Sequence, residues 1–124
     1  MKRILCNVVV LEALLFHCAA CATHSPPHSE TTVTIEVTTL MDGISSEDTE
    51  TAITTPLENF LVTMPSLRGM HSISGHGRSR IWLQLKGITA PDALKLVRQQ
   101  VAEAAGRLPA GATRPVVTES RYPE

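Results

Sequence analysis

Strand and helix signals meet in the stretch TVTIEVTTLMDGISSED, which spans residues 32–48. Its first half alternates apolar β-branched residues with polar ones, and this period of two is typical of a strand with one buried face. Its second half places Ser45 three residues before Asp48, which is a helix-start signature. The stretch therefore predicts a half-buried strand over residues 32–38 and a helix that begins near Ser46.

The predicted helix carries an apolar stripe that a proline interrupts. Its members recur at helical spacing and are Ala52, Ile53, Leu57, Phe60, Leu61 and Met64. Pro56 cannot donate a backbone hydrogen bond to the carbonyl of Ala52. The sequence therefore predicts either a kink near Ala52 or a new helix start at Pro56, and Pro65 is expected to end the element.

Residues 69–87 are typical of a β-hairpin. The expected strands are residues 70–74 and 79–86, joined by a turn at residues 75–78. The dry face of the second strand is predicted to consist of Ile81, Leu83 and Leu85. Trp82 falls on the polar face, where it either marks a contact surface or is covered by the aliphatic stems of its neighbours.

A second helix and a short strand complete the pattern. Thr89 and Pro91 are suited to open the helix, and Gly106 and Pro109 to close it. Its apolar stripe is predicted to be Leu94, Val97, Val101, Ala105 and Leu108. Residues 115–119 are expected to form the last strand. The order βαββαβ predicts an α+β, ferredoxin-like fold, with two helices packed on one face of a four-stranded antiparallel sheet.

Composition restricts the classes of function. The chain has 124 residues, of which 43% are apolar and 19% charged, which suits one small domain. A net charge of -1 and an aromatic content of 3% provide neither the electrostatic attraction nor the stacking surfaces for nucleic acid, so no nucleic-acid partner is expected. The length leaves room for at most one membrane span, because each span needs about 20 apolar residues.

The first 22 residues are typical of a targeting segment. Two basic residues precede an apolar run over residues 4–22, which closes in small residues. Glu12 lies within this run, and an acidic group near the middle of a span costs about 3 kcal/mol on insertion scales. We expect a signal peptide cleaved after Ala22 or at a lipoprotein-like box ending in Cys21, or an N-terminal membrane anchor. A lipid-modified Cys21 or a retained anchor would hold the chain at the membrane through its leader, whereas cleavage after Ala22 would release it.

The expected domain plan follows from these segments. Residues 1–22 are the signal peptide or anchor, 23–31 a Pro-containing linker, 32–120 the folded subdomain and 121–124 a tail. All three cysteines lie in the leader, so no disulfide framework is expected.

No residue set in the folded part predicts catalysis. His71 and His76 are the imidazoles available to activate a nucleophile, and neither lies in a triad or elbow context. The glycines around His76 are not followed by a helix, so a turn explains them better than a phosphate cradle. Glu47, Asp48 and Glu50 are explained by the positive end of the helix dipole. We expect no enzyme activity, no cofactor and no metal site.

Several motifs, in order along the chain, resemble the porter domain of resistance-nodulation-division (RND) efflux pumps of the acriflavine-resistance type. The resemblance covers residues 32–120. It includes the strand-to-helix junction, the first porter helix with its mid-helix Pro-Leu-Glu, the following loop and hairpin, and the segment that ends the subdomain. The matching segments are VTIEVTT (33–39), DGISSED (42–48), ETAITTPLE (50–58), MPSL (64–67), HSISGHGRSRI (71–81), LPAGA (108–112) and PVV (115–117).

This resemblance implies the first of four periplasmic porter subdomains, with a role in efflux of drugs or metal ions as part of a larger assembly. In such pumps the second helix of this subdomain lines the central pore of a trimer. Its counterpart here is residues 91–106, and the pore-facing candidates are Lys95, Arg98, Gln99 and Glu103. An ordinary solvated helix face explains these residues equally well. The implied partners are other pump subdomains or the pump trimer, and the implied location is the periplasm or the periplasmic face of the inner membrane.

The family's membrane helices and their charged proton relay have no counterpart in this sequence, so we expect a truncated or standalone subdomain without proton-coupled transport of its own. An alternative of a different class is an exported or lipid-anchored ferredoxin-like binding module. Such a module would use the edge or the uncovered face of the sheet.

Overall fold

The computed structural model describes residues 31–124, so the predicted leader and nearly all of the predicted linker lie outside the described residues. The elements, in chain order, are β1 (Thr32–Leu40), α1 (Ser46–Thr49), the π-helical turn η1 (Glu50–Thr54), α2 (Thr55–Leu61), β2 (Leu67–Gly75), β3 (Arg78–Lys86), α3 (Ala90–Ala105) and β4 (Val116–Ser120). Among these residues, none of the helices has both the length and the apolar character needed to cross a membrane.

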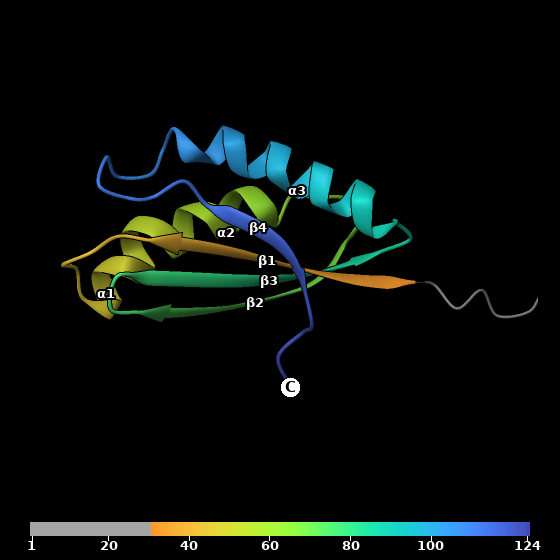
Figure 1. The fold of residues 1–124 in the computed structure, drawn as a ribbon, viewed down its shortest axis with the longest axis horizontal. Coiled ribbons are helices and arrows are strands. Elements are labelled where there is room, and N and C mark those ends of the chain that lie inside the picture. The colour runs from red at the N-terminus through yellow and green to blue at the C-terminus, as the bar shows by residue number, and fades with distance from the viewer. Residues whose placement is uncertain (1–30) are drawn as a thin grey trace, which may run out of the picture.

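The four strands form one antiparallel sheet in the order β2-β3-β1-β4. Helices α2 and α3 lie on the same side of this sheet (Figure 1). This arrangement confirms the predicted ferredoxin-like fold. Strand β1 pairs with β3 on one side and with β4 on the other, and Thr34 near its beginning lies opposite Ser120 at the end of β4.

The core lies between the sheet and the helices. The predicted dry face of β3, formed by Ile81, Leu83 and Leu85, is fully buried. It packs with β1 and with Ile53, Leu57 and Leu61 of the first helical segment. Burial along α3 differs from the prediction: the buried residues are Ala93, Val97, Val101 and Ala104, whereas Leu94, Ala105 and Leu108 are only partly buried. The buried face of α3 thus consists of alanine and valine, and the larger Leu94 lies at its margin.

The helix starts at the predicted cap. The Ser45 hydroxyl accepts a hydrogen bond from the Asp48 amide at 3.0 Å, and the Asp48 carboxylate accepts one from that hydroxyl at 2.8 Å. Asp48 therefore takes part in the cap, whereas the Glu50 carboxylate accepts a hydrogen bond from the Ser74 hydroxyl of the hairpin.

The π-helical turn η1 accommodates Pro56. The Thr55 amide donates to the Glu50 carbonyl, five residues earlier, which places Pro56 in the first turn of α2. Proline is tolerated at that position because its ring fixes φ at a helical value. Of the two predicted alternatives, the new helix start is closer to the structure, although the backbone stays helical throughout. The helix ends at Leu61, before Pro65.

The hairpin is longer than predicted, and its turn is tighter. Strand β2 already begins at Leu67, and only His76 and Gly77 separate it from β3. Gly77 has a φ of 64° and its carbonyl accepts a hydrogen bond from the Met41 amide at 2.8 Å. The hairpin turn is thereby attached to the segment that follows β1.

Trp82 lies on the sheet face away from the helices, yet only 4% of it is exposed. The Arg80 guanidinium lies 4.5 Å from the centroid of its ring, and the His71 ring centroid is 5.8 Å away. Neighbouring side chains therefore cover Trp82, as in the second of the two alternatives that the sequence left open, but the contacts are with a guanidinium group and an imidazole ring and not with aliphatic stems. Beyond β4, Tyr122 approaches the same cluster, with its ring 6.3 Å from His71.

The Glu36 carboxylate is the centre of a hydrogen-bond network next to the cluster of Trp82, Arg80 and His71. Glu36 accepts hydrogen bonds from Arg80 Nε at 2.8 Å, from the Thr38 hydroxyl at 3.1 Å and from the Ser120 hydroxyl at 3.2 Å. These interactions connect β3, β1 and β4 across the outer face. The hydrogen bond from Arg80 lowers the pKa of Glu36 below its usual value of 4.5.

A lowered pKa makes the contribution of Glu36 to stability depend on pH. The unfolded chain takes up this proton at higher pH than the folded chain, so the contribution is present above pH 4.5 and is lost as the pH falls through the lower folded pKa. We expect urea midpoints to fall more steeply between about pH 5 and pH 3 for the native chain than for Glu36→Gln. Parallel pH profiles would contradict this assignment.

Candidate functional site

The predicted pore-facing residues all lie on α3. The helix begins at Thr89, whose hydroxyl accepts a hydrogen bond from the Asp92 amide at 3.3 Å, and Pro91 occupies its first turn. Its buried side faces the core. The remaining side of the helix is exposed, and it carries Lys95, Arg98, Gln99 and Glu103.

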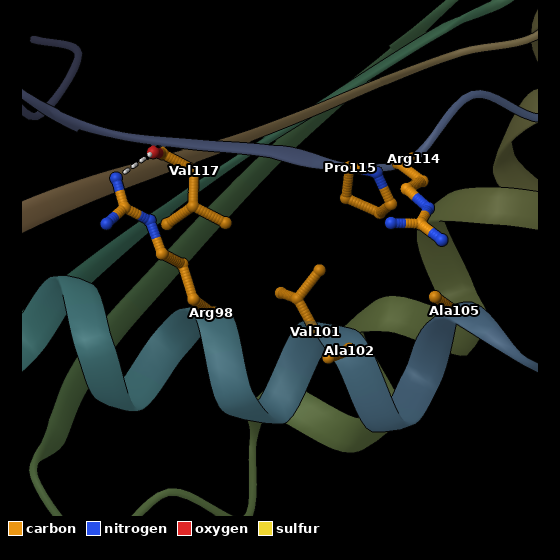
Figure 2. Close-up of a pocket in the computed structure, with 7 residues that line it drawn as sticks. All are labelled: Arg98, Val101, Ala102, Ala105, Arg114, Pro115 and Val117. Carbon is orange, nitrogen blue, oxygen red and sulfur yellow. Dashed lines mark hydrogen bonds between the residues drawn. The ribbon is translucent and has the colours of Figure 1, made fainter.

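The four candidates differ in the interactions that their side chains make. Arg98 is directed toward the edge strand β4, where its Nη2 donates to the Val117 carbonyl oxygen at 3.5 Å (Figure 2). Within residues 31–124, the side chains of Lys95, Gln99 and Glu103 make no hydrogen bond or ion pair. The structure therefore places three candidates on an outward face and the fourth at its side.

A groove runs along that side of the helix, between α3 and β4. Its volume is about 410 Å³, and its walls are Arg98, Val101, Ala102, Ala105, Arg114, Pro115 and Val117 (Figure 2). Apolar side chains form its middle, and an arginine stands toward each end. We name these seven residues the α3–β4 groove.

Sequence reasoning missed this groove. It placed Arg98 on the solvated face and did not consider Arg114. The groove depends on the reversal of the chain after α3, which brings residues 114–117 back beside residues 98–105. Pro115 at the start of the predicted last strand was the available signal, because proline suits an edge strand, but it gave no indication of which helix face would lie opposite.

Comparison with known proteins identifies the family. The sequence matches the AcrB/AcrD/AcrF family over residues 25–123. The chain belongs to this family. The predicted relationship to RND efflux transporters is therefore confirmed.

Two curated relatives of this AcrB/AcrD/AcrF-family chain are similar over 82 residues, each with 34% identity. They are the cation efflux system protein CzcA of Alcaligenes sp. (strain CT14) and the cobalt-zinc-cadmium resistance protein CzcA of Cupriavidus metallidurans (strain ATCC 43123 / DSM 2839 / NBRC 102507 / CH34). The matched segment covers 65% of this chain and 8% of each relative. The chain thus corresponds to a small part of the proteins that it resembles.

The remaining chemical candidates of this AcrB/AcrD/AcrF-family chain are far apart. His71 packs beside Trp82 on the outer face of the sheet, whereas His76 Nδ1 lies 3.3 Å from the Ser46 hydroxyl at the hairpin turn. In the part of the chain that the structure describes, no three His, Cys, Asp or Glu side chains are grouped so that they could hold a metal ion.

A polar seam joins the first helical segment to β2 and β3 and was not predicted. Thr54 is fully buried, and its hydroxyl lies 2.7 Å from the Ser74 hydroxyl and 2.8 Å from that of Ser79. The Ser72 hydroxyl donates to the Glu58 carboxylate at 2.5 Å. These hydroxyls satisfy one another, so the seam positions the helix on the sheet without offering a free site.

Proposed function

We propose that this chain is the first porter subdomain of an RND-type efflux pump and that it acts as part of a larger assembly at the periplasmic face of the inner membrane. Family membership over residues 25–123 and the ferredoxin-like fold support this proposal. The observation that carries it is the family match, and the exposed face of α3, where Lys95, Gln99 and Glu103 have no partner within residues 31–124, is compatible with a pore-lining position. Such a face is suited to line an aqueous passage between subunits.

The same proposal assigns the chain to transport and not to catalysis. The candidate pore lining contains Lys95 and Arg98 together with Glu103, and therefore carries both signs of charge. A lining of mixed sign gives weak discrimination between ions, because charge selectivity in pores comes from rings of one sign. We therefore propose that α3 shapes the passage and that other parts of the assembly select the substrate.

Metal cations are the first candidate cargo, and drugs are the second. Both relatives are named for cation efflux or for resistance to cobalt, zinc and cadmium. Cells in which this chain is produced with its pump partners are expected to tolerate these cations better than cells without it. Unchanged tolerance to the cations, together with increased tolerance to a cationic dye, would instead support drug efflux.

Cross-linking tests the position of α3. In a chain whose three leader cysteines are replaced by serine, Gln99→Cys is expected to form disulfide-linked dimers in the membrane fraction under mild oxidation, because equivalent helices would meet around the pore. Asn59→Cys, on the exposed side of α2, is the matched control and should remain monomeric. Equal cross-linking of the two variants, or none in either, would refute the pore-lining position.

Co-purification tests the larger assembly. After mild detergent extraction, we expect the full chain to be recovered with other pump components. Recovery of the chain alone, as a soluble monomer, would favour the alternative of an exported binding module with a ferredoxin-like fold.

A further inference from the structure

The α3–β4 groove combines an apolar middle with cationic ends. Val101 and Ala105 of α3 form one wall, and Pro115, directly before β4, and Val117 of β4 form the other. Its volume of about 410 Å³ lies within the range of small-molecule sites, which is about 300–1,000 Å³. The guanidinium groups of Arg98 and Arg114 lie toward opposite ends of this apolar stretch (Figure 2).

Both arginines are exposed, and neither is neutralised by a described residue. Arg98 donates only to the Val117 carbonyl, at 3.5 Å, and Arg114 makes no side-chain hydrogen bond or ion pair within residues 31–124. The backbone before Arg114 is fixed, because the Thr113 amide donates to the Leu40 carbonyl at 2.7 Å and its hydroxyl accepts from the Leu40 amide at 3.0 Å. The backbone that carries Arg114 is therefore positioned, and both guanidinium groups lack an anionic partner within residues 31–124.

The acidic residues next to the groove do not fill this role. Glu103 follows Ala102 on α3, and Glu119 lies two residues beyond Val117 on β4. Neither carboxylate comes within 4 Å of Arg98 or Arg114. The charge pattern of the groove consequently remains positive, apolar, positive.

Charge complementarity points to an elongated anion. We infer that the α3–β4 groove binds a linear aliphatic dicarboxylate, with one carboxylate at Arg98, the other at Arg114 and the methylene chain along Val101, Ala105 and Val117. A guanidinium group matches the planar carboxylate and can bind it through two parallel hydrogen bonds. The apolar walls exclude water from the methylene chain and favour its burial.

A peptide strand added to β4 fits the same edge less well. Pro115 has no amide to donate, and Arg98 already occupies the Val117 carbonyl. Proline and a charged side chain at an edge strand are features that discourage strand addition. The observations therefore favour a small dianion over an extended polypeptide.

This inference is independent of the proposed pump assembly. It needs only one copy of the chain and the local geometry of α3 and β4. A chain that fails to cross-link through Gln99→Cys could still bind the dicarboxylate, so the two proposals fail separately.

A titration tests the inference directly. The ¹⁵N-labelled full chain is titrated with adipate, suberate and sebacate while the amide signals of Val101, Ala105 and Val117 are followed. We expect saturable shifts at these residues with a Kd of about 1 mM for the best-fitting length, because exposed ion pairs are individually weak. Decanoate, with one carboxylate and the same chain length as sebacate, is expected to bind about threefold more weakly than sebacate.

Variants identify the two anchoring groups. Arg98→Gln and Arg114→Gln are each expected to weaken binding of the best dicarboxylate about threefold, and the double variant about tenfold. Arg98→Lys should retain part of the affinity, because the positive charge is kept. Arg68→Gln, which removes an exposed charge from β2, is the matched control and should bind as the native chain does.

The inference is overturned if the shifts do not saturate or appear outside the groove. It is also overturned if decanoate binds as tightly as sebacate, or if Arg68→Gln weakens binding as much as Arg98→Gln. Unchanged amide spectra of the free variants would show that their folds are intact.

Discussion

Gly77→Ala is expected to lower the free energy of unfolding by about 3 kcal/mol. Gly77 has a φ of 64°, and an alanine in that conformation costs about 1–2 kcal/mol. An added Cβ would also overlap the carbonyl oxygen of Met41, which is backbone and cannot rotate away. Relief of that overlap would disturb the 2.8 Å hydrogen bond between the Met41 amide and the Gly77 carbonyl, at a further cost of about 1 kcal/mol.

Gly43→Ala separates the cost of a positive φ from the cost of steric overlap with a neighbouring atom. Gly43 has a φ of 82°, but a Cβ built there meets no atom within 4 Å. We expect this control to lose only about 1 kcal/mol, the cost of the backbone conformation alone. Urea unfolding followed by circular dichroism measures both variants. Similar losses in the two would show that the Met41 contact contributes nothing.

Leu57→Ala is expected to have an effect of the same size or larger, about 3–4 kcal/mol. Leu57 is fully buried in the core between α2 and the sheet, directly after Pro56. Truncation removes apolar contacts and leaves a cavity that the π-turn and the short helix α2 can close only in part. The loss would appear as a lower urea midpoint with an unchanged slope.

Val62→Ala is the matched control for this truncation. Val62 follows α2 and is 58% exposed, so its change is expected to stay within about 0.5 kcal/mol. A loss below about 1 kcal/mol for Leu57→Ala would contradict the packing of α2 on the sheet.

The elements with strong local signals were predictable from the sequence. The alternation in β1, the Ser45 cap and the Thr89 cap depend on residues close together in the chain, and all three are confirmed. The π-turn before Pro56 was not predictable, because a kink, a new helix start and an extra residue in one turn all relieve the same missing hydrogen bond. Packing against the sheet determines which of these forms.

The candidate site was predictable only in part. Helical spacing places Lys95, Gln99 and Glu103 on one exposed face, and the structure agrees. The direction of Arg98 depends on β4, and the groove depends on residues 114–117, which are distant in sequence from α3. Hydrophobic periodicity describes a single helix and contains no information about the partner beside it.

The pairing of Thr34 with Ser120 has a consequence for how this unit is built into larger proteins. The start of β1 and the end of β4 therefore lie at the same end of the sheet, on neighbouring, hydrogen-bonded strands. A unit whose two ends are close together can be inserted into a longer polypeptide. The two segments that flank the insertion then stay close to each other, and the structure of the host does not have to change.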